Sequence, residues 1–303
     1  MKDKLLIVGG TGFIGCNLAK KSKELDYEVT CISSKYPPKI KRLNNVNYLI
    51  CDITKKKNIT SKLKNLKFDY VVNLSGYVDH SKKVLTYKTH YLGAKYLIDF
   101  FSKKKIFKFI QVGSSLEYGN LKNPNDEKDT NLNLKLHSYY SNSKLKTTKY
   151  LFRKFKKDKF PFIVIRPYLV YGPGQDFNRV IPIIIRAALN NHEFECTDGK
   201  QKRDFLYIDD LVSGIIKSLK VKNKAEIINI GYGKPYSIKY VINKIIKHVG
   251  KGKPLYGLKK IRKDENLISY PKINKAKKLL NWQPKIDFKK GIINTINYYK
   301  NEK

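Results

Sequence analysis

The chain is poor in residues that bind metals or form disulfides. Among its 303 residues it has four cysteines, Cys16, Cys31, Cys51 and Cys196, and no two of them form a Cys-x-x-Cys pair. The five histidines do not cluster with them. This spacing excludes the usual zinc sites, so we expect no metal. Buried, reduced thiols are typical of a cytoplasmic protein.

Long hydrophobic runs are also missing. The longest, such as residues 5–8 and 181–185, are far too short to span a bilayer. The opening MKDKLLIVGG is basic and then apolar, but its apolar part is shorter than that of a signal peptide, and no small-residue cleavage site follows. We therefore expect no membrane span, and we interpret residues 5–8 as a first buried strand.

Acidic residues and arginines are scarce as well. Sixty-three basic residues stand against 25 acidic ones, which gives a net charge of +38, yet only seven residues are arginines. Such a charge is compatible with nucleic-acid binding. The lysines, however, are spread along the whole chain and form no tail or stripe. This distribution favours compositional drift over a nucleic-acid function. In either case the charge would attract anionic substrates.

Apolar runs rich in β-branched residues alternate with segments of helical period. The runs predict strands at 5–8, 28–32, 47–51, 70–74, 107–112 and 162–166, with helices near 13–25, 55–66, 82–103 and 140–156. This alternation predicts a parallel sheet with helices on both faces. The order weakens beyond residue 170. There we expect short strands near Phe194 and Phe205, a β-run at 227–230, and helices at 178–190, up to Leu219 with Asp209 or Asp210 as its cap, 237–249, 274–280 and 288–299.

A glycine-rich loop, GGTGFIG, directly follows the first expected strand and precedes the first expected helix. In this context the spacing of Gly9, Gly12 and Gly15 indicates a dinucleotide-binding loop, because Gly12 lets the backbone approach a pyrophosphate. The helix start, with Phe13 and Ile14, offers free N–H groups and a positive dipole to that anion.

The loop and the alternation together predict the fold class. It is α/β: a Rossmann-type doubly wound parallel sheet with a smaller, interleaved C-terminal α/β substrate domain. We expect residues 1–170, with returning segments near 204–232, to form the dinucleotide-binding domain. Residues 171–303 would form mainly the substrate-binding domain.

The ends of the second and third strands bear on the choice of cofactor. An NAD site usually has an acidic residue after the second strand, where it binds the ribose hydroxyls. Here Ser33, Ser34 and Lys35 stand in that place, and two hydroxyls with a cation suit the 2′-phosphate of NADP. NADP is therefore favoured, and NAD bound through the serine is the alternative. Asp52, followed by Ile53, could meet the adenine amine or cap the next helix.

Two residues four apart, Tyr140 and Lys144, would share one face of a helix. A nearby ammonium lowers the pKa of a phenol, and such a phenol can move a proton to or from a hydroxyl. The sequence GSSLEYG, which begins at residue 113, lies about 25 residues upstream. A bound nicotinamide would accept or donate the hydride.

The chain resembles the extended short-chain dehydrogenase/reductase family, in particular the NAD-dependent epimerase/dehydratase group that acts on nucleotide sugars. The resemblance covers nearly the full length and rests on several motifs in the right order. They are GGTGFIG, NLSG (73–76), GSSLEYG (113–119), YSNSK (140–144), RPYLVYGPGQ (166–175), RDFLYIDD (203–210), INIG (228–231) and LLNWQP (279–284).

The resemblance implies a catalytic set and a cofactor pocket. Tyr140 would be the general acid/base, Lys144 would hold the nicotinamide ribose and lower the pKa of Tyr140, and Ser114 would hydrogen-bond the reacting oxygen. Further residues after the strands would contact the cofactor. They are Leu74, Ser75, Gly76, Val112 and Pro167.

The resemblance also implies substrate contacts and a homodimer. Arg203 and Arg262 fall where relatives grip the substrate diphosphate, and Arg179 is a further contact. A guanidinium can bind phosphate through two parallel hydrogen bonds, which lysine cannot do. Ser115 lies beside the expected catalytic serine. Tyr77 and His80 follow the fourth strand, where they could select the sugar. Helices 82–103 and 140–156 would pair across a two-fold axis.

Two departures from the family pattern limit the reaction. Sugar 4,6-dehydratases carry a Glu, often after an Asp, at the positions of Leu116 and Ser115 here. Glu117 comes one residue later, and on a strand that shift turns it to the other face. We therefore expect no dehydration. Leu169 replaces an Asn that often contacts the diphosphate.

The preferred hypothesis is an NAD(P)-dependent oxidoreductase that acts at C4 of a nucleotide-activated sugar, most simply a 4-keto-6-deoxy nucleotide-sugar reductase. The alternative is a nucleotide-sugar 4-epimerase with retained NAD. The same Ser114, Tyr140 and Lys144 serve both reactions. A remote alternative is a non-catalytic nucleotide- or nucleic-acid-binding protein. The intact catalytic set argues against it, so we expect no specific nucleic-acid partner.

Overall fold

The computed structural model describes residues 2–39, 42–261 and 266–301. Its centre is a seven-stranded sheet with the order β10-β6-β5-β4-β1-β2-β3, in which all neighbouring strands are parallel. The strands are β1 (Lys4–Val8), β2 (Glu28–Ser33), β3 (Val46–Ile50), β4 (Tyr70–Asn73), β5 (Lys108–Val112), β6 (Phe162–Pro167) and β10 (Ala225–Ile230). The predicted Rossmann-type fold is confirmed.

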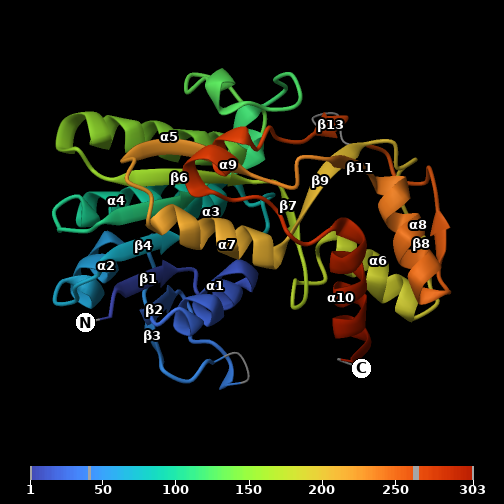
Figure 1. Cartoon of the computed structure of the whole chain (residues 1–303), viewed down its shortest axis with the longest axis horizontal. Helices are drawn as coiled ribbons and strands as arrows, with labels where there is room; N and C mark the ends of the chain where they lie inside the picture. The colour runs from blue at the N-terminus through green and yellow to red at the C-terminus, as the bar shows by residue number, and fades with distance from the viewer. Residues whose placement is uncertain (1, 40–41, 262–265, 302–303) are drawn as a thin grey trace.

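The sheet is apolar on both faces, as a strand covered on two sides has to be. In β1, Leu5 and Ile7 pack into one core and Leu6 and Val8 into the other, because successive side chains point to opposite faces. Helices cover both faces (Figure 1). One layer contains α1 (Phe13–Glu24) and α7 (Ile208–Leu219); the other contains α2 (Lys56–Leu63), α4 (Ala94–Phe101) and α5 (Tyr139–Asp158).

Most of the chain after residue 168, apart from α7, β10 and α9 (Asn274–Leu280), forms a smaller α/β part that lies beside the large sheet (Figure 1). Its main sheet has the order β11-β9-β13, with β7 paired to β9, and a two-stranded sheet joins β12 and β8. The strands are β7 (Leu169–Tyr171), β8 (Glu193–Glu195), β9 (Lys202–Tyr207), β11 (Pro235–Ser237), β12 (Lys253–Leu255) and β13 (Ile268–Ser269). Its helices are α6 (Val180–Leu189), α8 (Ile238–Val249) and α10 (Phe288–Asn301), whereas α9 packs against β10 and α7 of the large sheet.

Local sequence signals explain several helix ends. The hydroxyl of Ser138 accepts a hydrogen bond from the Ser141 N–H at the start of α5, and Ser237 does the same for α8. Gly250 ends α8 in the left-handed conformation, with φ of 81°. The expected helix at 82–103 is divided into α3 (Lys83–Tyr87), a π-helical turn η2 (Lys88–Gly93) and α4.

One expected helix start was wrong. Neither Asp209 nor Asp210 caps α7, because both lie within its first turn, after Tyr207. The Asp210 carboxylate instead accepts the backbone N–H groups of Lys285 and Ile286, at 2.8 and 3.0 Å. The residue therefore fastens the segment before α10 to α7.

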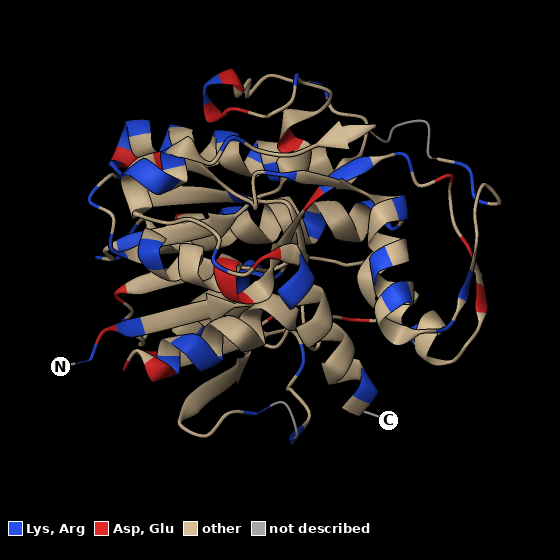
Figure 2. Cartoon of the chain, turned by 45° about the vertical axis from the view of Figure 1, so that its right-hand side comes forward, with Lys and Arg blue, Asp and Glu red and all other residues tan. Residues whose placement is uncertain are grey.

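The described part of the chain shows neither a membrane helix nor a metal cluster. None of its helices combines the length and the apolarity needed to cross a bilayer. No three of its His, Cys, Asp or Glu side chains are placed to hold a metal ion. Lysine and arginine are spread over helices and loops throughout the molecule and are not gathered in one stripe (Figure 2). This arrangement agrees with compositional drift as the source of the charge.

Trp282 attaches the C-terminal segment to α7. Its ring is 2% exposed and its Nε1–H donates to the carbonyl oxygen of Asp210 at 3.0 Å. We expect Trp282→Ala to lower the free energy of unfolding by about 3–5 kcal/mol, because it leaves a large cavity and removes a buried hydrogen bond. Urea unfolding measures the loss. Phe107→Ala is the control: this ring is 56% exposed, and its removal should cost less than about 1 kcal/mol. Equal losses would contradict the assignment.

Candidate active site

The glycine-rich loop forms a cradle at the end of β1. Gly9 has φ of 79°, and a Cβ on Gly15 would lie 2.3 Å from the Gly9 carbonyl oxygen. No side chain caps the start of α1, and no acidic residue lies in its first turn. The free N–H groups therefore face the cavity beside them, as a pyrophosphate site requires. The residues present thus fit a dinucleotide.

That cavity, of about 1130 Å³, runs along the carboxyl edge of the sheet and into the smaller part of the molecule. Most of the residues predicted to contact the cofactor line it. They are Gly9, Gly12, Phe13, Ile14, Gly15, Ser33, Ser34, Asp52, Ile53, Leu74, Ser75, Gly76, Val112, Tyr140, Lys144 and Pro167. Because parallel strands end at the same edge, side chains from distant segments meet there.

The adenosine end differs in part from expectation. Lys35 is exposed and lies outside the cavity lining, while the Ser33 hydroxyl donates to the Lys35 carbonyl oxygen at 2.5 Å. The Asp52 carboxylate accepts the N–H and the hydroxyl of Thr54, at 3.0 and 2.7 Å. It does not cap α2, whose N-cap residue is Lys55. The 2′-phosphate interpretation therefore rests on the two serines.

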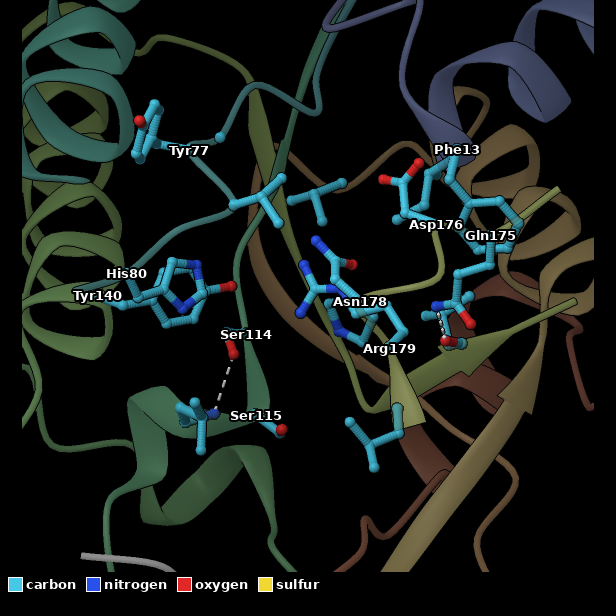
Figure 3. A pocket seen from close by; sticks show the side chains of 18 of the residues that line it. Phe13, Tyr77, His80, Ser114, Ser115, Tyr140, Gln175, Asp176, Asn178 and Arg179 are labelled. Carbon is cyan, nitrogen blue, oxygen red and sulfur yellow. Dashed lines mark hydrogen bonds between the residues drawn. The ribbon is translucent and has the colours of Figure 1, made fainter. Parts of the chain in front are cut away.

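The expected acid/base residues converge in the middle of the cavity. Tyr140 lies in the first turn of α5, and Lys144 in the next turn donates from Nζ to the Val112 carbonyl oxygen at 2.7 Å. The Ser114 hydroxyl accepts the N–H of Leu116 at 3.2 Å and lies near the Tyr140 hydroxyl, whose pKa it lowers (Figure 3). A phenol, a hydroxyl and an ammonium thus lie at one point of the cavity wall.

Burial dominates the electrostatics of this set. It lowers the pKa of the Lys144 ammonium to about 8. It raises the pKa of Tyr140, while the hydrogen bond from Ser114 and the charge of Arg179 lower it and the Glu117 carboxylate raises it. The net direction is the opposite of the lowering that we expected from Lys144. The reason is that desolvation of a phenolate in this position outweighs the favourable charges around it.

The predicted substrate residues lie toward the other end of the cavity. Arg179, at the start of α6, and Arg203, in β9, both line it, as do Tyr77 and Ser115. Figure 3 shows Arg179 and the neighbouring Asn178 across the cavity from Tyr140 and Ser114. Arg262 lies outside the described residues.

His80 stacks on the phenol that we expect to be the acid/base. Its ring lies 4.0 Å from that of Tyr140, with an angle of 17° between the planes (Figure 3). Tyr140 is therefore covered on one face by a residue of the exposed loop after β4. This position brings His80 to the acid/base set itself.

The model of the NAD dependent epimerase/dehydratase family matches residues 5–231. The chain belongs to this family. Two relatives extend the match. A dTDP-D-glucose 4,6-dehydratase from Dictyostelium discoideum is 33% identical over 80% of this chain, which spans 62% of that protein. A putative UDP-glucose 4-epimerase from Methanocaldococcus jannaschii is 29% identical over 98% of both chains.

A solved structure agrees with the fold of this family member. The UDP-glucose 4-epimerase of Thermotoga maritima, in complex with UDP-glucose, superposes with a TM-score of 0.92 over 99% of both chains, at 24% identity. At this identity the likeness shows the fold alone. The family description makes NAD the family's cofactor, whereas a preference of this member for NADP is not part of it.

Sequence reasoning missed His90. This buried side chain lies in the π-helical turn η2, and its ring meets that of Tyr140 edge-on, 4.8 Å away. Its Nε2 accepts the Tyr77 N–H at 3.0 Å, and burial lowers its pKa to about 2, so it is neutral at physiological pH. A Cβ on Gly76 would lie 2.6 Å from its ring. A lone histidine within a helical pattern gives no sign of this contact.

The serine at the end of β2 offers a direct test of cofactor choice. We expect Ser33→Asp to weaken NADPH binding by at least about tenfold and to leave NADH binding equal or tighter, because a carboxylate repels the 2′-phosphate and binds ribose hydroxyls. Nucleotide fluorescence titration measures both affinities. Ser34→Asp, one residue further out, is the matched comparison. Unchanged NADPH affinity in Ser33→Asp would show that Ser33 does not face the ribose.

Proposed function

We propose that the chain is a nucleotide-sugar 4-epimerase that keeps its NAD bound. The observation that supports this proposal most directly is the single cavity that joins three groups of residues. The glycine cradle lies at one end, Arg179 and Arg203 lie at the other, and the acid/base set of Ser114, Tyr140 and Lys144 lies between them. A redox cofactor and an anionic sugar nucleotide would therefore meet at a phenol.

Similarity along the whole chain favours the epimerase over the reductase. The relative described as a putative UDP-glucose 4-epimerase aligns with 98% of both chains, so the likeness includes the substrate end as well as the cofactor end. Sequence reasoning alone preferred a 4-keto-6-deoxy nucleotide-sugar reductase. The relatives reported above do not carry that activity in their names, so the former alternative becomes the main proposal.

The residues of the site divide the chemistry between them. Tyr140, as its phenolate, would take the proton from the sugar 4-hydroxyl and later return it, and Ser114 would hold the same oxygen through its hydroxyl proton. NAD, when bound, supplies the acceptor and donor of the hydride. Lys144 would bind the nicotinamide ribose, and Arg179 and Arg203 would fix the substrate diphosphate. Tyr77, His80 and Ser115 would contact the sugar.

The structure supports the absence of dehydratase chemistry. Leu116, at the position of the dehydratase Glu, is 48% exposed and carries no acid. Glu117 lies in a short 3-10 helix, η3 (Ser115–Tyr118), and not on a strand as we expected. Its side chain nevertheless does not line the cavity, because it is fully buried against Arg166. Neither residue can donate a proton to a leaving hydroxyl in the cavity.

One observation keeps the reductase as a second candidate. The end of β2 offers Ser33 and Ser34 to the cavity in place of an acidic residue. This suits the 2′-phosphate of NADP, which as an exchangeable reductant would serve a reductase. The raised pKa of Tyr140 also suits this direction, because a protonated phenol can donate to a keto oxygen.

Location and assembly belong to the proposal as well. Four cysteines that form no disulfide, three of them buried, support a cytoplasmic protein. Exposed apolar side chains on α3, Val84 (65% exposed) and Leu85 (41%), support a homodimer through α3–α4 and α5.

The test is epimerisation without added cofactor. Purified protein would be incubated with UDP-glucose and with UDP-glucuronate, and NMR would follow the C4 epimer. We expect conversion by the wild type and a loss of at least about 100-fold in Tyr140→Phe, which removes the proton-transfer group. Tyr139→Phe is the matched control, because this neighbouring ring is 52% exposed and should be dispensable.

The outcomes separate the candidates. NAD released from denatured wild-type protein would support retention of the cofactor. No epimer, but NADPH oxidation with 4-keto-6-deoxy nucleotide sugars that is lost in Tyr140→Phe, would favour the reductase. No activity in either assay would show that the substrate is not a nucleotide sugar of these kinds.

A further inference from the structure

Glu117 is the most completely buried acidic residue near the catalytic set. Its side chain and that of Arg166, on β6, are both 0% exposed, and Arg166 Nη2 donates to Glu117 Oε2 at 3.0 Å. The guanidinium also lies over the ring of Tyr118, at 4.3 Å, and donates from Nη1 to Thr130 Oγ1 at 2.8 Å. Such a pair is expensive to desolvate, so its presence calls for a role beyond simple packing.

One carboxylate oxygen of Glu117 holds the catalytic serine. Oε1 accepts the backbone N–H of Ser114 at 2.8 Å, while the Ser114 hydroxyl accepts the N–H of Leu116 at 3.2 Å. This reciprocal cap occupies one lone pair of the hydroxyl and leaves its proton and second lone pair for Tyr140 and the substrate oxygen. The fit is tight: a Cβ on Gly113 would lie 2.2 Å from Oε1.

The other carboxylate oxygen holds the catalytic helix. Oε2 accepts the hydroxyl of Thr148 at 2.6 Å. Thr148 lies on α5 one turn after Lys144 and two turns after Tyr140, and it is fully buried. Glu117 therefore connects η3, which carries Ser114, to α5, which carries the other two residues, and both to β6.

We propose that Glu117 is a positioning residue of the acid/base set, which through its two oxygens fixes Ser114 and α5 relative to each other. The proposal rests on the proposed roles of Ser114, Tyr140 and Lys144, but it does not depend on which sugar is the substrate. From the sequence pattern we inferred only that Glu117 does not act in dehydration, whereas the proposal gives this residue a structural role in the site.

The charge of Glu117 acts on the same residues. Its carboxylate raises the pKa of Lys144 and of Tyr140. The other titratable groups around Lys144 are Tyr140 on its own helix and His90 on η2, and Arg166 faces the carboxylate from β6. His90 is neutral and the phenol is protonated near pH 8, so Glu117 is the acidic group whose charge keeps Lys144 protonated.

The first experiment follows the protonation of Lys144 in the absence of a sugar substrate. NADH affinity would be measured by fluorescence between pH 7 and 9.5, where we expect it to fall as Lys144 loses its proton. In Glu117→Gln the fall should begin lower by about half a pH unit or more, because the charge that favours the ammonium is gone. We also expect kcat at pH 7.5 to fall about tenfold in this variant, since small displacements of reacting groups are costly.

A second set of variants separates positioning from stability. Thr148→Val removes the link to α5 and should lower kcat about fivefold, and Thr148→Ser should restore it. Thr295→Val is the matched control, since Thr295 is equally buried and likewise loses one hydrogen bond, to the Gly291 carbonyl, but lies in α10. It should lose stability and keep the wild-type kcat. This set remains decisive if Glu117→Gln fails to fold.

Several results would overturn the proposal. They are a flat NADH affinity in the wild type, superimposable pH curves for the wild type and Glu117→Gln, or a Thr148→Val protein that behaves like Thr295→Val. Failure of the epimerase proposal looks different, because it would leave the NADH curves shifted while UDP-sugars stay unconverted.

Discussion

The hydrogen bond from the Lys144 ammonium to the Val112 carbonyl oxygen, 2.7 Å long, is the contact on which the site depends. It joins the end of β5, at the carboxyl edge of the sheet, to the second turn of α5. A buried ammonium is unfavourable unless it is bonded and faces an opposite charge. Here the carbonyl supplies the bond and Glu117 the charge, and the pKa still falls to about 8. The position of the Lys144 ammonium therefore depends on how the sheet, η3 and α5 are placed relative to one another.

Burial acts on the two ends of the acid/base pair in opposite senses. It raises the pKa of Tyr140 and lowers that of Lys144, so each is driven toward its neutral form. A phenolate beside an ammonium is then a state of higher free energy than it would be in water. The charge of Arg179 lowers the pKa of Tyr140 and so makes the phenolate less unfavourable. In the proposed reaction, removal of a proton from the sugar hydroxyl would therefore be favoured by the charge of Arg179.

Those parts of the fold and site that depend on local signals could be predicted from the sequence. Strand β1 is a short apolar run before a glycine loop, and Tyr140 and Lys144 share a helix face because four residues make about one turn. Contacts between distant segments could not be predicted. His90, which meets Tyr140 edge-on, lies in a π-helical turn that the residue pattern does not predict. Likewise, the bonds of Asp210 to a segment 75 residues later follow from packing.

At several positions in and around the cavity the chain has arginine in place of lysine. The chain uses lysine for nearly all of its positive charge, yet the fully buried partner of Glu117 is Arg166, and Arg179 and Arg203 line the substrate end of the cavity. A planar guanidinium can donate to Glu117 and Thr130 while it lies over the Tyr118 ring, whereas an ammonium has neither the fork nor the flat face. On the surface a lysine charge needs only water, whereas the buried partner of Glu117 has to satisfy a fixed hydrogen-bond geometry.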